Sequence, residues 1–177
     1  LANGIRVFLK VTDFKNDEIQ FTAYSPGGHS LVPDGEYVAA ITASSVVGEG
    51  GLAHFNQIEL QKKLAGKVVS VSPWIGELEE GLSGSASPQD LQTLFELIYA
   101  NFTTPRQDST AFQAFKTRVK GFIQNRSAQP EAAFEDTVQV TMAQHHFRAR
   151  PWSLELIEEM DLGTSMAVYR DRFADAG

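Results

Sequence analysis

Residues 36–47, with the sequence EYVAAITASSVV, combine helical spacing with apolar side chains on almost every side. A helix of this kind is buried rather than half-exposed, because no face of it is suited to water. We therefore predict a buried helix here, which the GEGG segment at residues 48–51 ends. Its apolar side chains are those of Val38, Ala39, Ala40, Ile41, Ala43, Val46 and Val47.

Two segments before this helix show the alternation that is typical of a β-strand. In residues 4–11, GIRVFLKV, every second side chain is apolar, and residues 18–25, EIQFTAYS, repeat the pattern. The polar stretch at residues 13–17 reads as a turn between them. The pattern predicts an antiparallel pair of strands, followed by a loop rich in Gly and Pro.

Two further strands are predicted at residues 67–78 and 79–87, and the second consists mainly of small residues. Small residues in a strand favour the close approach of another backbone. Ser87 and Pro88 then give the N-cap and the first position of a helix. Helical spacing predicts helices at residues 55–66, at 91–102, from 108 or 109 with Phe112, Phe115, Val119 and Phe122 inward, at 130–144, at 153–160 and at 164–173.

This order of elements places locally paired strands before a run of helices that must cover one face of the sheet. The fold class expected is therefore α+β, with two layers and a mainly antiparallel or mixed sheet. A chain of 177 residues suits a single domain, so we predict one domain over residues 1–177.

The composition excludes several classes of function. A net charge of −7 argues against a broad surface for nucleic acid or anionic membranes. The chain has no cysteine, so disulfides, thiolate catalysis and cysteine-based zinc sites are excluded. It has no run of about 18 apolar residues, so no membrane span is predicted. It shows no signal peptide and begins at Leu1, and we expect a piece of a longer protein.

The segment GEGGLAHFNQIEL at residues 48–60 begins like H-x-x-E-H, the inverted zinc motif of one peptidase class. His54 is in place, but Gln57 stands where the catalytic Glu is required and Ile58 where the second His is required. Glu59 lies five residues after His54, an offset that does not share one helix face. We interpret His54 as an ordinary polar residue at a helix start, and a divergent zinc site of His54, Glu59 and His29 remains the alternative.

The other two histidines, His145 and His146, are adjacent, so on a helix they point about 100° apart and do not readily share a metal. Arg148 and Arg150 follow them, which favours the basic end of a helix. Two acidic clusters, in a predicted turn and near the C-terminus, are interpreted as solvated rather than as acid–base pairs. They consist of Glu77, Glu79 and Glu80, and of Glu158, Glu159 and Asp161.

The glycine-rich segments SPGG at residues 25–28 and GEGG at residues 48–51 match neither the dinucleotide fingerprint nor the P-loop. No nucleophile lies in a recognisable elbow. The residues by themselves therefore predict a soluble α+β domain without a catalytic constellation.

Several longer stretches carry a resemblance. They are LANGIRVFLKVTDFKNDEIQFTAYSPGG, FNQIELQKKLAGKVVSVSPWIGE, GLSGSASPQDLQTLFELIYANF and KTRVKGFIQNRSAQPEAAF. In order and spacing the chain resembles the pitrilysin/insulinase-type zinc metalloproteases, which belong to the inverzincin clan. The resemblance implies the metallopeptidase fold of the mitochondrial processing peptidase, used in repeated homologous domains.

In that family the active domain carries zinc on H-x-x-E-H, early in the helix after the first two strands, and a later helix adds a Glu. The matching helix here is EYVAAITASSVV, which offers Val38, Ile41 and Thr42. The later helix has Gln124 and Asn125 where the acid is expected. The resemblance thus implies no catalytic residue and no metal ligand in this domain, with zinc in the active domain of the parent protein. It identifies no binding residues.

The chain is most similar to the first domain of the inactive, C-terminal half of such a protease. This implies a chamber wall that contacts peptide substrate opposite the active domain, with neighbouring domains of the same protease as partners. Bacterial relatives are often exported, so a periplasmic location is expected. A stand-alone interaction module and a divergent active zinc peptidase are the alternatives.

Overall fold

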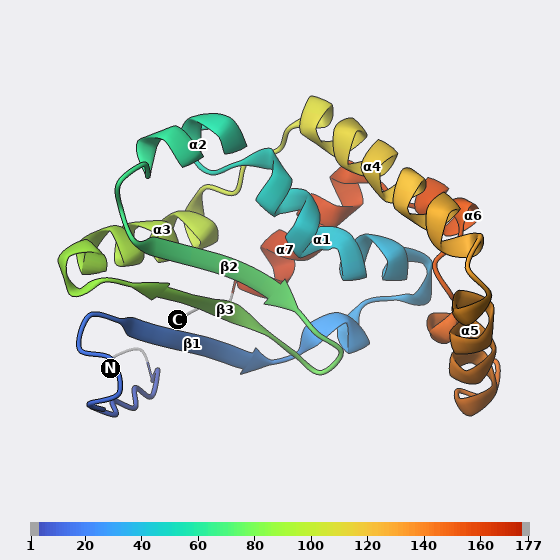
Figure 1. Ribbon diagram of the computed structural model, residues 1–177, viewed down its shortest axis with the longest axis horizontal. Coiled ribbons are helices and arrows are strands. Elements are labelled where there is room, and N and C mark those ends of the chain that lie inside the picture. The colour runs from blue at the N-terminus through green and yellow to red at the C-terminus, as the bar shows by residue number, and fades with distance from the viewer. Residues whose placement is uncertain (1–3, 175–177) are drawn as a thin grey trace.

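The computed structural model describes residues 4–174 as one three-stranded sheet with helices (Figure 1). The strands are β1 (Ile19–Pro26), β2 (Val69–Ile75) and β3 (Glu79–Ala86). The α-helices are α1 (Tyr37–Gly50), α2 (Gln57–Lys63), α3 (Leu91–Thr103), α4 (Ser109–Ser127), α5 (Pro130–Met142), α6 (Leu154–Glu158) and α7 (Leu162–Phe173). Short 3₁₀ turns are η1 (Gly28–Leu31), η2 (Asp34–Glu36), η3 (Pro88–Asp90) and η4 (Phe147–Ala149).

The sheet has the order β1-β3-β2, and both pairs are antiparallel. The α+β class and the mainly antiparallel sheet are confirmed. Pairing is less local than expected, because β1 pairs with β3 across more than 50 residues of chain rather than with residues 4–11. The small residues of β3 allow it to lie between β1 and β2, with a strand close on each side. A Cβ on Gly84 would lie 2.1 Å from the carbonyl oxygen of Ser70, so no larger residue fits there unless the strands shift.

Helix α1 is buried, as its sequence predicts. It packs against α7, and the Ser165 hydroxyl donates a hydrogen bond to the Ala39 carbonyl at 3.2 Å. Leu82 of the central strand and Tyr169 of α7 complete the core around it, both 0% exposed. The helix runs to Gly50 rather than ending at residue 47, so most of the GEGG segment is helical and only Gly51, with a φ of 86°, ends it.

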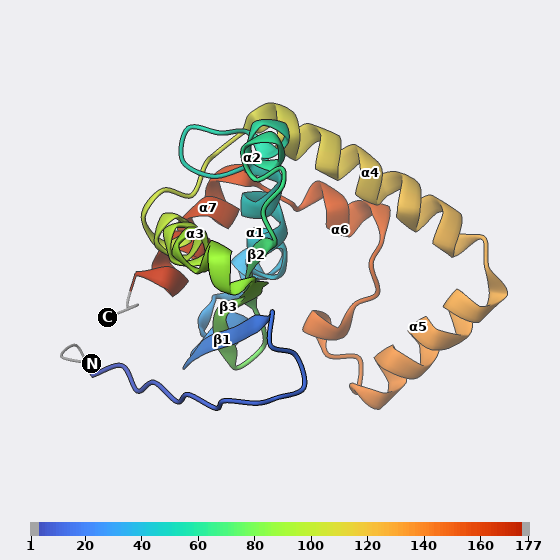
Figure 2. The same cartoon turned by 60° about the vertical axis from the view of Figure 1, so that its left-hand side comes forward.

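Helices α4 and α5 form an arm that leaves the core (Figure 2). Arg126 holds the two helices together with a hydrogen bond of 2.8 Å to the Asp136 carboxylate. Phe112 and Ile123 of α4 are buried against α1 and α6, but Phe122 is 66% exposed. The prediction that Phe122 faces inward is therefore wrong, because the outer part of α4 has no layer above it to bury a full face.

The strand predicted at residues 4–11 is absent from the structure. No strand is assigned to residues 4–11, and the first assigned strand starts only at Ile19. Phe8 and Leu9 are 86% and 91% exposed, on opposite sides of the segment. Alternating apolar residues stabilise a strand only where one of its faces is buried, and both faces of residues 4–11 are exposed.

The helix boundaries otherwise follow the sequence closely. Helix α2 begins at Gln57, two residues later than expected, and α5 ends at Met142, two residues earlier. Within residues 4–174, no helix combines the length and apolarity needed to cross a bilayer.

Candidate functional site

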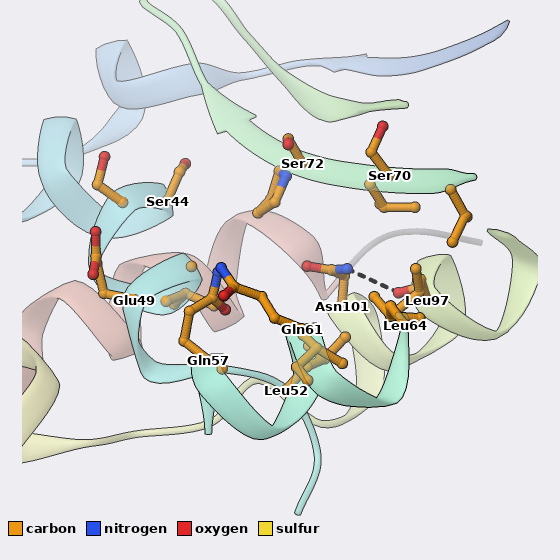
Figure 3. Close-up of a pocket in the computed structure, with 18 of the residues that line it drawn as sticks. Ser44, Glu49, Leu52, Gln57, Gln61, Leu64, Ser70, Ser72, Leu97 and Asn101 are labelled. Carbon is orange, nitrogen blue, oxygen red and sulfur yellow. Dashed lines mark hydrogen bonds between the residues drawn. The ribbon is translucent and has the colours of Figure 1, made fainter. Parts of the chain in front are cut away.

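A concavity lies between the outer edge of β2 and helix α2, with the C-terminal part of α1 and helix α3 closing its ends (Figure 3). We call it the β2 cleft. Its volume is about 610 Å³, within the size range of ligand-binding pockets. The apolar walls come from Leu60 of α2, its C-cap residue Leu64, Leu97 of α3, and Val69 and Val71 of β2.

Helix α2 owes its place to a capping box. The Asn56 side chain accepts a hydrogen bond from the Glu59 N–H at 3.0 Å, and the Glu59 carboxylate accepts one from the Asn56 N–H at 2.9 Å. Two backbone donors of the first turn are thereby satisfied. Just before it, Leu52 forms bridges to Phe55 and to Pro105, which fix the connection between α1 and α2. The role of Glu59 is thus to cap a helix.

The polar side chains of the cleft come from α1, α2, α3 and β2, which contributes Ser70 and Ser72. Gln57 and Gln61 lie on the α2 side, and the Ser44 hydroxyl of α1 is buried without a hydrogen-bond partner among the described residues. Asn101 is 6% exposed and donates to the Leu97 carbonyl at 2.8 Å. An unpartnered buried hydroxyl costs free energy of folding.

Glu49 is the one ionisable side chain among the residues that line the cleft, and it forms an ion pair with Arg118. The lining offers hydroxyl, amide and backbone groups but no nucleophile paired with a base. Such chemistry suits binding rather than group transfer. Sequence reasoning identified none of the residues of this cleft as a site, because they come from five elements, α1, α2, β2, α3 and α4, spread over residues 44–115.

The structure does not bring His54, Glu59 and His29 together. His54 is exposed in the turn before α2, beyond the C-terminal end of α1. His29 contacts Tyr37, the first residue of α1, with ring centroids 5.4 Å apart. Helix α1 lies between the two histidines, and its 14 residues span about 20 Å. The geometry does not favour the divergent zinc site.

His29 belongs to a cluster at the other end of α1, with Tyr37, Phe147 and Arg148. Burial lowers the pKa of His29 and raises the pKa of Tyr37, because a charged ring is poorly solvated there. The His29 Nδ1 atom is buried without a partner among the described residues. The Arg148 guanidinium lies 5.1 Å from the Tyr37 ring centre and supplies the positive charge of the cluster.

His145 and His146 follow α5 in a tight turn rather than ending a frayed helix. Gln144 and His145 have φ angles of 52° and 58°, a left-handed conformation that stops α5. The His146 Nδ1 atom accepts a hydrogen bond from the Arg148 N–H at 3.3 Å, which caps the next turn. The structure therefore gives His146 a local capping role.

The prediction that the acidic cluster at residues 77–80 is solvated is wrong for Glu80, which is buried. Its exposed fraction is 6%, and its carboxylate accepts a hydrogen bond from the Gly28 N–H. Strand alternation places Glu80 on the inner face with Leu82, and the SPGG loop folds over the carboxylate. Glu77 and Glu79 are exposed, as predicted.

The second acidic cluster takes part in surface contacts. Glu158 pairs with Lys116 at 2.9 Å, and Glu159 accepts a hydrogen bond from Arg150 at 3.1 Å. Asp161 accepts a hydrogen bond from the Thr164 N–H at 2.7 Å and caps α7. None of the three carboxylates lines the β2 cleft.

The side chains at the positions that the family resemblance ties to zinc do not suit that metal. On α1, Val38 is buried, and the Thr42 hydroxyl donates to the Val38 carbonyl at 2.7 Å. Gln124 and Asn125 are exposed on α4. These side chains provide neither an imidazole nor a carboxylate. Within residues 4–174, no three His, Cys, Asp or Glu side chains gather closely enough to hold a metal ion.

Comparison with known proteins gives one consistent relationship. No protein-family model matches the chain. A zinc protease PQQL-like protein of Arabidopsis thaliana is 24% identical over 178 residues, covering 99% of this chain. The chain resembles pitrilysin/insulinase-type zinc proteases. The resemblance expected from the sequence is thereby confirmed.

Solved structures show the same fold. The periplasmic protease PqqL from Escherichia coli matches 98% of the chain with a TM-score of 0.78 at 19% identity. A mutant of the ferredoxin protease FusC, in complex with Arabidopsis ferredoxin, matches 89% with a TM-score of 0.67 at 18% identity. The chain spans only 16% of the Arabidopsis protein and 19% of the PqqL chain.

Proposed function

We propose that this chain is a catalytically inactive, peptidase-like domain of a longer zinc protease. In this proposal it forms part of the wall of a substrate chamber and contacts peptide opposite the active domain. The observation that carries the proposal is the conflict on α1. The chain matches the fold of PqqL over almost its whole length. The sequence resemblance puts Val38, Ile41 and Thr42 at the positions that hold zinc in the family's active domain.

Peptide hydrolysis by a metallopeptidase requires a metal ion and a base. In a metallopeptidase, zinc polarises the carbonyl and lowers the pKa of bound water, and a carboxylate takes the proton. The active domain of the parent protein would supply both. This chain would supply surface, and its partners would be neighbouring domains and a peptide substrate rather than nucleic acid. FusC is named a ferredoxin protease, which supports substrates derived from proteins.

Metal content is the measurement that tests inactivity. The purified 177-residue chain would be dialysed against trace zinc and analysed by elemental mass spectrometry, with a peptide-hydrolysis assay alongside. We expect no stoichiometric zinc and no chelator-sensitive hydrolysis. Stoichiometric zinc that disappears in His54→Ala would overturn the proposal and restore the divergent zinc site. Zinc that persists in His54→Ala would overturn it in favour of another ligand set.

The gene around this chain tests the proposed place in a larger protein. An H-x-x-E-H motif upstream in the same reading frame is the expected result. A short complete gene with its own start codon would favour the stand-alone interaction module instead. PqqL of Escherichia coli is described as periplasmic, so we also propose a periplasmic location, which cell fractionation would check.

A further inference from the structure

A second concavity lies between helices α2 and α3 (Figure 1), and we call it the α2–α3 groove. Its volume is about 390 Å³, within the size range of pockets for small ligands. Leu60 and Leu64 line both concavities and form a ridge between them. Gln57 and Gln61 lie on the β2 side of this ridge, and Lys63 lies on the side of the groove.

The groove has two different ends, because α2 and α3 run in opposite directions. The Ala53 N–H, just before α2, donates to the carbonyl of Thr104, just after α3, at 3.0 Å. At the other end the Val68 N–H donates to the carboxylate of Asp90, just before α3, at 2.8 Å. The groove therefore runs from an apolar end to a positively charged end. The apolar end is lined by Leu52, Phe55 and Ala100, and the charged end by Lys63 and Lys67.

Lys63 supplies a positive charge that has no counter-ion. It forms no ion pair or side-chain hydrogen bond within residues 4–174, whereas Lys67 is paired with Asp90 at 3.5 Å. Among the described residues that line the groove, Glu96 is the one acid, and it accepts a hydrogen bond from Gln92 at 2.8 Å. One negative charge beside Lys63 would balance the free cation, and Glu96 would repel a second.

Thr93 adds a hydroxyl to the wall of the groove near its charged end. This residue lies in the first turn of α3 and is only 9% exposed. Its hydroxyl forms no hydrogen bond in the part of the chain that the structure describes. Thr103 of the same helix instead donates to the carbonyl of Tyr99 at 2.8 Å. The Thr93 hydroxyl can therefore donate to an acceptor bound in the groove.

We propose that the α2–α3 groove binds a free fatty acid with an unbranched chain of medium length. Its carboxylate lies beside Lys63 and accepts a hydrogen bond from Thr93, and its tail follows Leu60 and Leu64 towards the apolar end. A linear tail suits a groove that runs along α2, whose seven residues span about 10 Å. This inference is independent of the proposed function.

A carboxylate fits the groove better than a phosphate does. A phosphate monoester carries a charge of about −1.5 to −2 at pH 7, which exceeds the single free cation of Lys63. The excess charge would lie near Glu96. A fatty acid carries one negative charge, which Lys63 balances.

Calorimetric titration of the 177-residue chain with hexanoate, octanoate and decanoate, below their micelle concentrations, tests the proposal. We expect saturable binding that strengthens at least about threefold with each added pair of methylenes, since one fully buried methylene strengthens binding about fourfold. Decylammonium has the decyl tail with the opposite charge, and we expect it to bind at least about threefold more weakly than decanoate. Binding without saturation, an affinity that does not depend on chain length, or equal affinity for decylammonium would overturn the proposal.

Matched variants locate the carboxylate. Lys63→Gln removes the free cation, and Lys62→Gln removes an equal charge from the same turn of α2 that lines neither concavity. We expect decanoate affinity to fall about threefold to fivefold in Lys63→Gln and to stay within about 1.5-fold in Lys62→Gln. Thr93→Val keeps the shape of the side chain without its hydroxyl and should weaken binding about threefold. Glu96→Gln should leave the affinity equal or higher, because it removes a negative charge.

Three results with these variants would overturn the inference. Equal losses in Lys62→Gln and Lys63→Gln would show unspecific attraction to the basic end of α2. A loss in Gln61→Ala without one in Lys63→Gln would place the ligand in the β2 cleft. Weaker binding in Glu96→Gln would exclude a carboxylate beside Lys63.

Circular dichroism checks that each variant is folded. The two lysine variants alter exposed side chains, so their comparison decides the outcome even if Thr93→Val unfolds. Failure of decanoate binding leaves the metal-content test of the proposed function unaffected, so the two proposals fail separately.

Discussion

At the scale of single residues, Arg148 joins segments more than 100 positions apart in the chain. Its guanidinium donates to the carbonyls of His29 at 3.0 Å and Val32 at 2.7 Å, and to the Asp34 carboxylate at 2.6 Å. It also lies over the Tyr37 ring. A planar group with five donors makes these contacts together, whereas a lysine provides only a point charge.

We therefore expect Arg148→Ala to lower the free energy of unfolding by roughly 2 to 4 kcal/mol, because hydrogen bonds from a charged donor are lost and carbonyls are left unpaired. Arg148→Lys should recover only part of this. Urea unfolding measures both. Arg118→Ala is the control, since Arg118 makes an exposed ion pair and its loss should cost less than about 1 kcal/mol. Equal effects at the two positions would contradict the assigned role of Arg148.

Glu80 and Glu79 offer a second comparison at this scale. Both begin β3, but Glu80 is buried and accepts the Gly28 N–H, whereas Glu79 is exposed. Glu80→Ala should destabilise the fold by about 2 kcal/mol, because a buried donor loses its partner. Glu79→Ala should stay within about 0.5 kcal/mol. Thermal unfolding with both variants measures the difference, and similar losses would show that the SPGG loop does not depend on Glu80.

At the scale of elements, aspartates fix the starts of helices. Asp108 accepts the Ala111 N–H at 2.9 Å at the start of α4, and Asp161 caps α7 through the Thr164 N–H. These backbone donors stabilise the ionised carboxylates, so they lower the pKa of each aspartate below its ordinary value. The caps consequently make stability depend on pH.

Proton linkage gives the direction in which stability changes with pH. A lowered pKa means that the folded chain binds fewer protons than the unfolded chain, so the stability from the caps is complete above the unfolded pKa, about 3.9. It is lost as pH falls through the folded values. We expect the unfolding temperature to drop below about pH 4, and to drop less in Asp161→Asn, since asparagine caps without titrating. If the unfolding temperature of Asp161→Asn fell at low pH as much as that of the unsubstituted chain, Asp161 would not contribute to the pH dependence.

At the scale of the whole molecule, the chain exposes apolar side chains in its N-terminal segment. Phe8, Leu9 and Val11 are 86%, 91% and 97% exposed. Contiguous exposed apolar surface marks contact sites or promotes self-association. This surface is what a domain packed against neighbours would present, in keeping with the proposed function.

Replacing Phe8, Leu9 and Val11 together by serine should reduce self-association and change the free energy of unfolding by less than about 1 kcal/mol, because these side chains bury little in the described chain. Sedimentation velocity and urea unfolding check the two statements. Phe21→Ser is the control, since Phe21 packs against the main core and its loss should cost at least about 2 kcal/mol. A comparable loss from the triple substitution would show that the segment packs on the fold after all.

The sequence by itself determined the elements whose signals are local. The apolar residues of α1 required burial, the Ser87 and Pro88 pair marked the helix start before α3, and Pro130 opened α5. Period-two alternation located β1, β2 and β3 to within a few residues. These features depend on neighbouring residues, whose spacing is printed in the chain. The family resemblance also came from the sequence, because order and spacing carry it.

Only the tertiary structure decided what depends on residues far apart. It placed β3 between β1 and β2, left residues 4–11 outside the sheet and buried Glu80 beneath the SPGG loop. It also formed the β2 cleft from five separate elements. Alternation predicts that a segment can be a strand but not which strand it will pair with, since that choice rests on packing across the whole chain.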